Sequence, residues 1–251
     1  MSVIKKQLGD LTFYELTRDD VRRMQAMINI FIELMPQYAH YVARLEESTE
    51  RTGARHADHL HHVWLIEKAG EPAAMAAFEY VRRWNIGLGM DIAVYPALRR
   101  YVLPDGRPLA HAILDAMVEA LQDDARQFGS VPYTVMGGEV HSDRLLERFQ
   151  TYGMVEIPIT YYEPPDVSGQ HDLQGFSGTA DEIAALEALG YHAMHLGMFP
   201  PKNNTALDIY DRELWRRLVH AYYIDHYKLQ ADSRALQIAL HSIEQFQPSS
   251  A

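Results

Sequence analysis

The sequence of 251 residues contains no cysteine. Disulfides, thiolate metal ligands and a cysteine nucleophile are therefore excluded. It also lacks an apolar run of the roughly 18 residues that a membrane-spanning helix needs. The amino-terminal segment has no apolar stretch of the secretory type. We therefore expect a cytoplasmic protein without a membrane partner.

Acidic residues outnumber basic residues in this sequence. The chain has 23 Lys and Arg against 34 Asp and Glu, which gives a formal net charge of −11. General nucleic-acid binding requires a basic face that neutralises phosphates, so no nucleic-acid partner is expected. The long-range field of an acidic protein instead favours small cations, such as amines.

The apolar residues follow two different periods. Spacings of three and four predict helices over residues 20–35, 109–128 and 143–152, a more polar helix over 38–52, and helical stripes between 215 and 246. Shorter runs predict strands over 11–16, 62–67, 73–81, 86–94, 133–140, 154–162 and 193–199. This order is typical of an α+β, or mixed α/β, protein rather than a doubly wound parallel sheet.

A basic turn containing glycine joins the predicted strand 86–94 to the helix that starts near residue 109. The first amides of a helix lack intrahelical acceptors, and the helix dipole favours an anion beside them. Arg99, Arg100 and Arg107 add positive charge at this point. The turn is either a pyrophosphate site or a surface turn with solvated arginines, and its own residues leave both interpretations open.

The stretch Gly106-Arg-Pro-Leu-Ala-His-Ala-Ile-Leu114 resembles the phosphate-binding motif of the GNAT superfamily of acyl-CoA-dependent N-acetyltransferases. Asp105 and Pro108 depart from the motif, where Arg or Gln and Gly are usual. The hairpin 63–81, the strand 135–140 and the helix–strand segment 145–157 have the order of that family. The resemblance implies a mostly antiparallel sheet with splayed fourth and fifth strands, helices on both faces, and additional carboxy-terminal helices.

The resemblance also implies a binding site for acetyl-CoA, the acyl donor. Backbone groups of the fourth strand would hold the pantetheine arm, and the turn and first helical residues would hold the pyrophosphate. The corresponding cofactor-binding residues are Ile92, Ala93, Val94, Arg99, Arg100, Gly106, Arg107, Leu109 and Ala110. The acceptor, a small amine or an amino-acid-like molecule, would attack the thioester directly, and catalysis would be mainly positioning and proton transfer.

Residues that could act as acid or base are identified by their place in the predicted strands and helices. Phe149 occupies the place of the family's usual tyrosine acid, so Tyr152, one helical turn on, is either a substitute or a packing anchor. Glu139 is the preferred base, unless it is an exposed carboxylate at a strand end. Asp91 stands in a central strand, where aspartate is unusual, and is either a base or a buried hydrogen-bonded group. Glu79 and His141 are further candidates.

The histidines at positions 56, 59, 61 and 62 invite a metal interpretation. His56 and His59 have helical i, i+3 spacing, but no H-E-x-x-H pattern accompanies them. We therefore expect no metal and interpret the segment as a linker into the hairpin.

The sequence predicts an acyltransferase domain over residues 1–200, with an insertion at about 166–192, and a helical extension over 201–251 packed on it. The function predicted is N-acetyltransferase. A non-catalytic acyl-CoA sensor on the same fold is the alternative, because Phe149 and Pro108 depart from the family pattern. The extension is compatible with a homodimer.

Overall fold

The computed structural model describes residues 2–51, 58–129, 135–165, 173–201 and 207–247. Thr52 of the predicted helix 38–52, Tyr133 of the predicted strand 133–140 and His56 of the predicted linker lie outside them. The chain divides into two compact units, Met1–Arg82 with Gly89–Val131, and Arg83–Leu88 with Pro132–Ala251. The predicted boundary at residue 200 stays a prediction.

The first unit is built on antiparallel strands in the order β1-β2-β3-β4. These are β1 (Val3–Leu8), β2 (Leu11–Glu15), β3 (His59–Lys68) and β4 (Glu71–Val81). β5 (Ile86–Val94) contributes its last six residues to this unit. The amide of Tyr95, just past β5, donates to the carbonyl of Ala73 in β4 at 3.1 Å.

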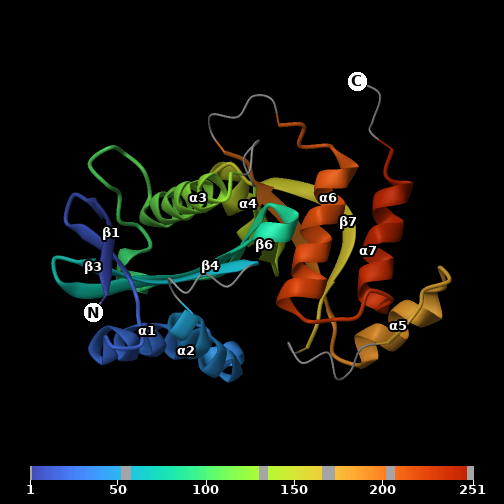
Figure 1. The fold of residues 1–251 in the computed structure, drawn as a ribbon, viewed down its shortest axis with the longest axis horizontal. Coiled ribbons are helices and arrows are strands. Elements are labelled where there is room, and N and C mark those ends of the chain that lie inside the picture. Colours follow the sequence, from blue (N-terminus) through green and yellow to red (C-terminus); the bar gives the residue numbers. More distant parts are fainter. Residues whose placement is uncertain (1, 52–57, 130–134, 166–172, 202–206, 248–251) are drawn as a thin grey trace. The chain divides into compact units, whose positions relative to one another are not determined.

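Helices cover both faces of these strands (Figure 1). The helices α1 (Val21–Leu34) and α2 (Val42–Arg51), joined by the 3₁₀ turn η1 (Pro36–Tyr41), lie on one face, and α3 (Leu109–Gln127) lies on the other. Phe31 and Met27 of α1 pack in one buried cluster with Val63, Leu65 and Met75 of the strands. The period of two along β3 therefore sends alternate side chains to the two helical layers.

The second unit pairs its strands in the antiparallel order β6-β8-β7. They are β6 (Met136–Val140), β8 (His192–Phe199) and β7 (Val155–Glu163), with α4 (Asp143–Thr151) between β6 and β7 and α5 (Ala180–Ala188) before β8. Thr179 and Glu182 form a capping box that fixes the start of α5.

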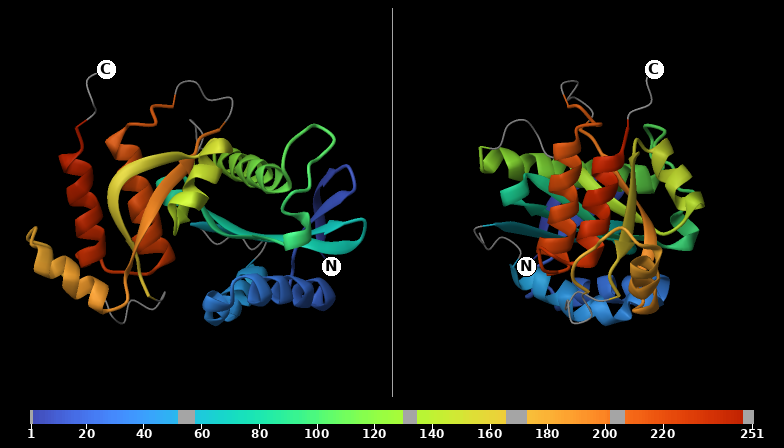
Figure 2. Two further views of the ribbon diagram at one scale, coloured as in Figure 1. Left: turned by 180° about the vertical axis from the view of Figure 1, so that it is seen from behind. Right: turned by 90° about the vertical axis from the view of Figure 1, so that its right-hand side faces the viewer.

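The carboxy-terminal helices α6 (Arg212–His220) and α7 (Arg234–Gln245) lie side by side, and α7 packs along β7 (Figure 2). Between them η4 (Ala221–His226) is a π-helix, which places Tyr222 and Tyr223 in the core. The hydroxyl of Tyr223 donates to the carbonyl of Tyr162 in β7 at 2.9 Å. The buried aromatic side chains thus attach these helices to the second unit.

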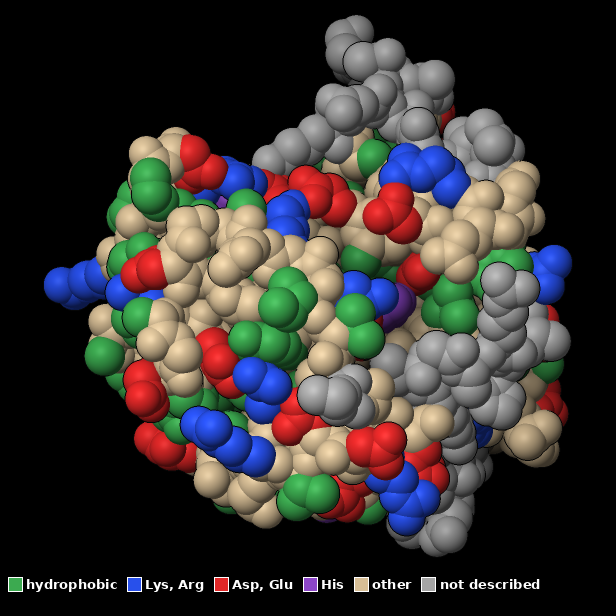
Figure 3. Space-filling view, turned by 60° about the vertical axis from the view of Figure 1, so that its left-hand side comes forward, with side chains coloured by type: hydrophobic (Ala, Val, Ile, Leu, Met, Phe, Trp, Pro, Cys, Tyr) green, Lys and Arg blue, Asp and Glu red, His purple; other side chains and the backbone are tan. Residues whose placement is uncertain are grey.

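The mixed α/β class and the antiparallel pairing confirm the prediction. The predicted gap between the fourth and fifth strands corresponds here to β5 and β6. Most of β5 belongs to the first unit and β6 to the second, so the gap stays a prediction. In the part of the chain that the structure describes, helices are too short or too polar to cross a bilayer. Acidic and basic side chains are interspersed among the described residues on the face in Figure 3.

Candidate functional site

The amino-terminal end of α3 is the first element of the candidate site. Gly106 adopts φ +86°, a conformation that glycine reaches without a steric penalty, and turns the chain toward the helix. Pro108 is the N-cap residue, and no side chain in the described part of the chain caps the helix. The amide of Leu109 donates to the carbonyl of Tyr101 at 3.0 Å. The amide of Ala112 donates to the carbonyl of Pro108 at 3.0 Å, so the helical hydrogen bonds start there. The amide of Ala110 precedes this bond and has no intrahelical acceptor, which is the property that an anion site requires.

The three arginines beside this helix end differ in their surroundings. Arg107 donates to Asp105 through Nε at 2.9 Å and to Asp115 through an η nitrogen at 2.7 Å. These bonds raise the pKa of Arg107 and lower that of Asp105. Two carboxylates therefore already occupy the guanidinium that we predicted to face phosphate, and its role as a ligand stays a prediction.

Arg99 and Arg100 keep exposed side chains next to this turn. The Nε atom of Arg99 donates to the carbonyl of Val94, the last residue of β5, at 3.2 Å. This bond holds the start of the basic turn against the end of the strand. Arg100 is thus a positive charge near α3 whose replacement disturbs little else among the described contacts.

β5 supplies Asp91 and the predicted pantetheine-binding segment. Asp91 and Ile92 are partly exposed, whereas Ala93 and Val94 are buried. Burial of the Asp91 carboxyl group raises its pKa to about 6, and the positive charge of Arg44 in α2 opposes this shift only in part. Asp91 can therefore change its protonation state close to neutral pH, as a general base must.

Glu139 in β6 is held by two tyrosines of the second unit. The Tyr161 hydroxyl donates to Oε1 at 2.5 Å, and the Tyr227 hydroxyl approaches Oε2 at 2.8 Å. Burial and the nearby Glu139 carboxylate raise the pKa of Tyr161 well above its usual value. From its position in the sequence, Glu139 is either a base or an exposed carboxylate. The structure shows a partly buried carboxylate whose acceptor positions hold two phenols.

Two glycines of β6 make room for protein side chains. A Cβ atom on Gly137 would lie 2.4 Å from Cδ1 of Leu218 in α6, and one on Gly138 would lie 2.8 Å from Cε of Met154. The space beside these two glycines is thus filled, in this unit, by Leu218 and Met154.

Tyr152 and Phe149 lie at the carboxy-terminal end of α4. Their ring centroids are 6.4 Å apart, and the Phe149 ring meets that of Phe199 edge-on at 6.0 Å. Tyr152 is partly exposed. Phe149 is therefore a packing residue, and the role of Tyr152 as an acid stays a prediction.

Sequence reasoning missed the partners of Glu139, because Tyr161 and Tyr227 are 22 and 88 residues away along the chain. A buried tyrosine needs a partner for its hydroxyl, but the pattern that buries it does not name the partner. His141 is exposed at the end of β6 and stays a candidate only.

Comparison with known proteins supports the fold. No protein-family model and no curated protein matches the sequence. A solved structure described as an acetyltransferase of the GNAT family from Bacteroides thetaiotaomicron is similar at 17% identity, with 87% of this chain and 99% of that chain covered and a TM-score of 0.53. The ribosomal-protein-S18-alanine N-acetyltransferase from Escherichia coli is 15% identical over 79% of this chain and 99% of its own, with a TM-score of 0.48.

The chain thus has the GNAT acyl-CoA N-acyltransferase fold, as the sequence predicted. At this level of identity the likeness establishes the fold, and any activity has to be argued from the residues of the site.

Proposed function

We propose that this protein is an N-acetyltransferase that transfers the acetyl group of acetyl-CoA to a small amine or an amino-acid-like acceptor. The observation that carries the proposal is the start of α3, which follows β5 in a GNAT-type fold and has no side-chain cap from any residue that the structure describes. In such a position the first amides of the helix are suited to a pyrophosphate.

The residues of the first unit fit this cofactor in two ways. Arg99 and Arg100 are exposed beside the helix end and supply positive charge, although the whole chain carries a net charge of −11. The backbone of Ile92, Ala93 and Val94 in β5 would hold the pantetheine arm, and Gly106, Leu109 and Ala110 would approach the phosphates. When bound, acetyl-CoA supplies an activated thioester carbonyl carbon for the amine to attack.

The chain's own task is then to orient the acceptor and to remove its proton. Asp91 is better suited to this than Glu139, because its pKa of about 6 leaves it ionised at neutral pH yet able to take up a proton. Glu139 already accepts hydrogen bonds from two phenols. Tyr152 remains the proposed acid for the leaving thiolate. The acidic chain favours acceptors that arrive as cations.

The test is calorimetric titration with acetyl-CoA of the wild-type protein and of two charge-reversal variants. Arg100→Glu lies beside α3, and Arg148→Glu is a matched control on the exposed face of α4. A single exposed charge contributes on the order of 1 kcal/mol, so its reversal should weaken binding about tenfold or more. The control should bind as the wild type does. Equal affinities for all three proteins would show that α3 is not the phosphate site.

A non-catalytic acyl-CoA sensor is the second candidate. Phe149, which packs against Phe199, favours it, because phenylalanine cannot donate the proton that the family's tyrosine supplies. Release of free thiol, measured with diamines, amino acids and peptide amino termini as acceptors, separates the two functions. Thiol release with any of these amines supports the transferase, and binding without release on the whole panel supports the sensor.

A further inference from the structure

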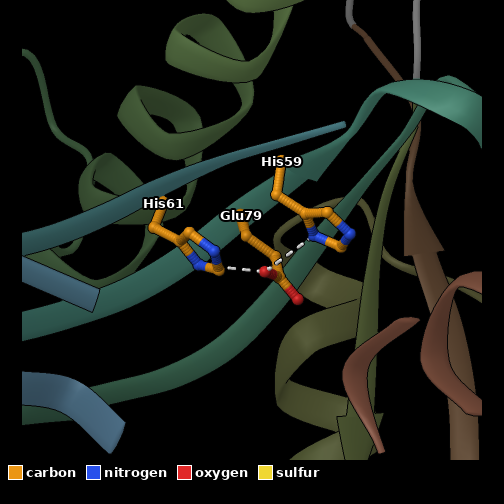
Figure 4. Close-up of side chains that lie close together, drawn as sticks. All are labelled: His59, His61 and Glu79. Atoms are coloured by element: carbon orange, nitrogen blue, oxygen red, sulfur yellow. Dashed lines mark hydrogen bonds and ion pairs between the residues drawn. The ribbon is translucent and has the colours of Figure 1, made fainter. Parts of the chain in front are cut away.

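Two histidines and a glutamate meet on the face of the first unit that α1 and α2 cover. His59 and His61 are two residues apart in β3 and therefore point to the same face. His61 lies directly opposite Glu79 of β4 in the strand register. Nδ1 of His61 is 3.0 Å from Oε2 of Glu79, and Nδ1 of His59 is 3.4 Å from the same oxygen (Figure 4).

The cluster is largely removed from solvent. The side chains of His59, His61 and Glu79 are 17%, 12% and 2% exposed. Although Nδ1 of His61 is close to the carboxylate, its geometry does not make a hydrogen bond, and this buried nitrogen has no hydrogen-bond partner among the residues that the structure describes. A buried polar atom without a partner is costly. A cation at the point where the two nitrogens and the oxygen converge would satisfy it.

The distances match a coordination sphere. One ligand atom from each residue can be chosen so that all three lie within 4.8 Å of one another. Metal–nitrogen and metal–oxygen bonds of about 2.0–2.1 Å place the ligands of a tetrahedral ion roughly 3.3 Å apart. The observed separations of 3.0 Å and 3.4 Å lie on either side of this value. Small side-chain rotations would complete the geometry.

We propose that His59, His61 and Glu79 bind a divalent transition-metal ion of the Zn²⁺ type, with at least one coordination position left open. Two imidazoles and one carboxylate bind such ions more strongly than they bind Mg²⁺ or Ca²⁺, which favour oxygen ligands. Helical spacing of these histidines predicted no metal. In the structure β3 begins at His59, so His59 and His61 are spaced as neighbours on one face of a strand.

The experiment is equilibrium dialysis of the full chain against Zn²⁺, with Co²⁺ absorption as a probe of tetrahedral geometry. The variants are His61→Ala and the nearly isosteric Glu79→Gln, and the control is His141→Ala, an exposed histidine at the end of β6. We expect one bound Zn²⁺ and a Zn²⁺-dependent rise in Tm in the wild type and in the control. Loss of a ligand should weaken binding at least about 100-fold, since even outer partners of ligands contribute 10- to 100-fold.

Circular dichroism of the variants without metal shows whether each is folded, and Glu79→Gln keeps the test valid if His61→Ala is not. The proposal is overturned if the wild type binds no more Zn²⁺ than His61→Ala and Glu79→Gln. It is equally overturned if His141→Ala loses the same ion. Neither result depends on acetyl-CoA binding, so the metal-site proposal and the transferase proposal can be refuted independently of each other.

Discussion

Replacing His62 should destabilise the first unit more than replacing any exposed histidine. His62 lies on the face of β3 opposite to His61 and bridges two acidic side chains. Its Nδ1 atom is 2.9 Å from Oε2 of Glu15, and its Nε2 atom is 2.8 Å from Oδ2 of Asp124 in α3. Glu15, His62 and Asp124 are 3%, 8% and 5% exposed. The imidazolium is therefore the central positive charge of a buried triad.

The charge state of His62 follows from these contacts. Burial by itself lowers the pKa of His62, but the hydrogen bonds to Asp124 and Glu15 outweigh it and raise the pKa to about 9. Burial correspondingly raises the pKa of Glu15, and the bond to His62 more than reverses this, so that Glu15 has a lowered pKa. At neutral pH both shifts indicate a charged histidine between two carboxylates.

The magnitude can be worked from the charges. His62→Ala leaves two buried carboxylates without their common partner, and removing one member of a buried ionic group typically costs about 3–5 kcal/mol. His141→Ala, on the surface, should change the free energy of unfolding by no more than about 0.5 kcal/mol. Urea unfolding followed by circular dichroism measures both. A cost below about 1 kcal/mol for His62→Ala would refute the charged triad.

The pH dependence gives a second readout with a definite sign. The folded pKa of about 9 lies above the usual 6.5, so the contribution is complete below pH 6.5 and is lost as the pH rises through 9. The difference of about 2.5 pKa units corresponds to about 3 kcal/mol at most. His62→Ala should therefore destabilise the protein strongly at pH 6 and less at pH 10. An equal effect at both pH values would contradict the assignment.

Two further predictions concern single residues of each unit. Asp91→Asn should stabilise the protein at pH 7 by up to about 3 kcal/mol and not at pH 4. The pKa of Asp91 rises from the usual 3.8 to about 6 in the folded protein, so ionised Asp91 is unfavourable only at the higher pH. Urea unfolding at both pH values tests this, and if Asp91 is the base, the same variant loses activity. Gly137→Ala should cost about 1–3 kcal/mol through its clash with Leu218, measured as a lower Tm, and the double variant with Leu218→Ala should be less than additive.

The sequence predicted those elements whose apolar pattern is strong and local. The helix 109–128 corresponds to α3 (Leu109–Gln127), and the hairpin 62–81 corresponds to β3 and β4 apart from the early start of β3. β1 (Val3–Leu8) was missed, because this edge strand is largely exposed and contains Lys5, Lys6 and Gln7 in place of an alternating apolar face. Among the described strands it pairs with β2 alone, so the burial that makes a strand recognisable is small there.

The candidate site was predictable to the extent that it follows from chain order. The turn before α3 and the unusual Asp91 stand next to each other in the sequence. In contrast, Arg107 is paired with Asp115, eight residues further along the chain, and Glu139 with tyrosines still further away. Spacing predicts which face a polar side chain occupies, but its partner is chosen by the packing of other elements.

In the segment 59–62, the period of two of a strand sends neighbouring histidines to opposite faces of the sheet. His59 and His61 point toward the layer of α1 and α2, and His62 points toward α3, where it meets Asp124. Neighbouring histidines of one strand thus belong to two different polar clusters on opposite faces of the sheet. Substituting His61 should abolish Zn²⁺ binding and leave the His62-dependent pH profile of unfolding in place, whereas substituting His62 should remove that profile and leave Zn²⁺ binding to the folded protein intact. If either variant disturbed both properties to the same extent, the two clusters would be one, and the assignment of these side chains to opposite faces would be wrong.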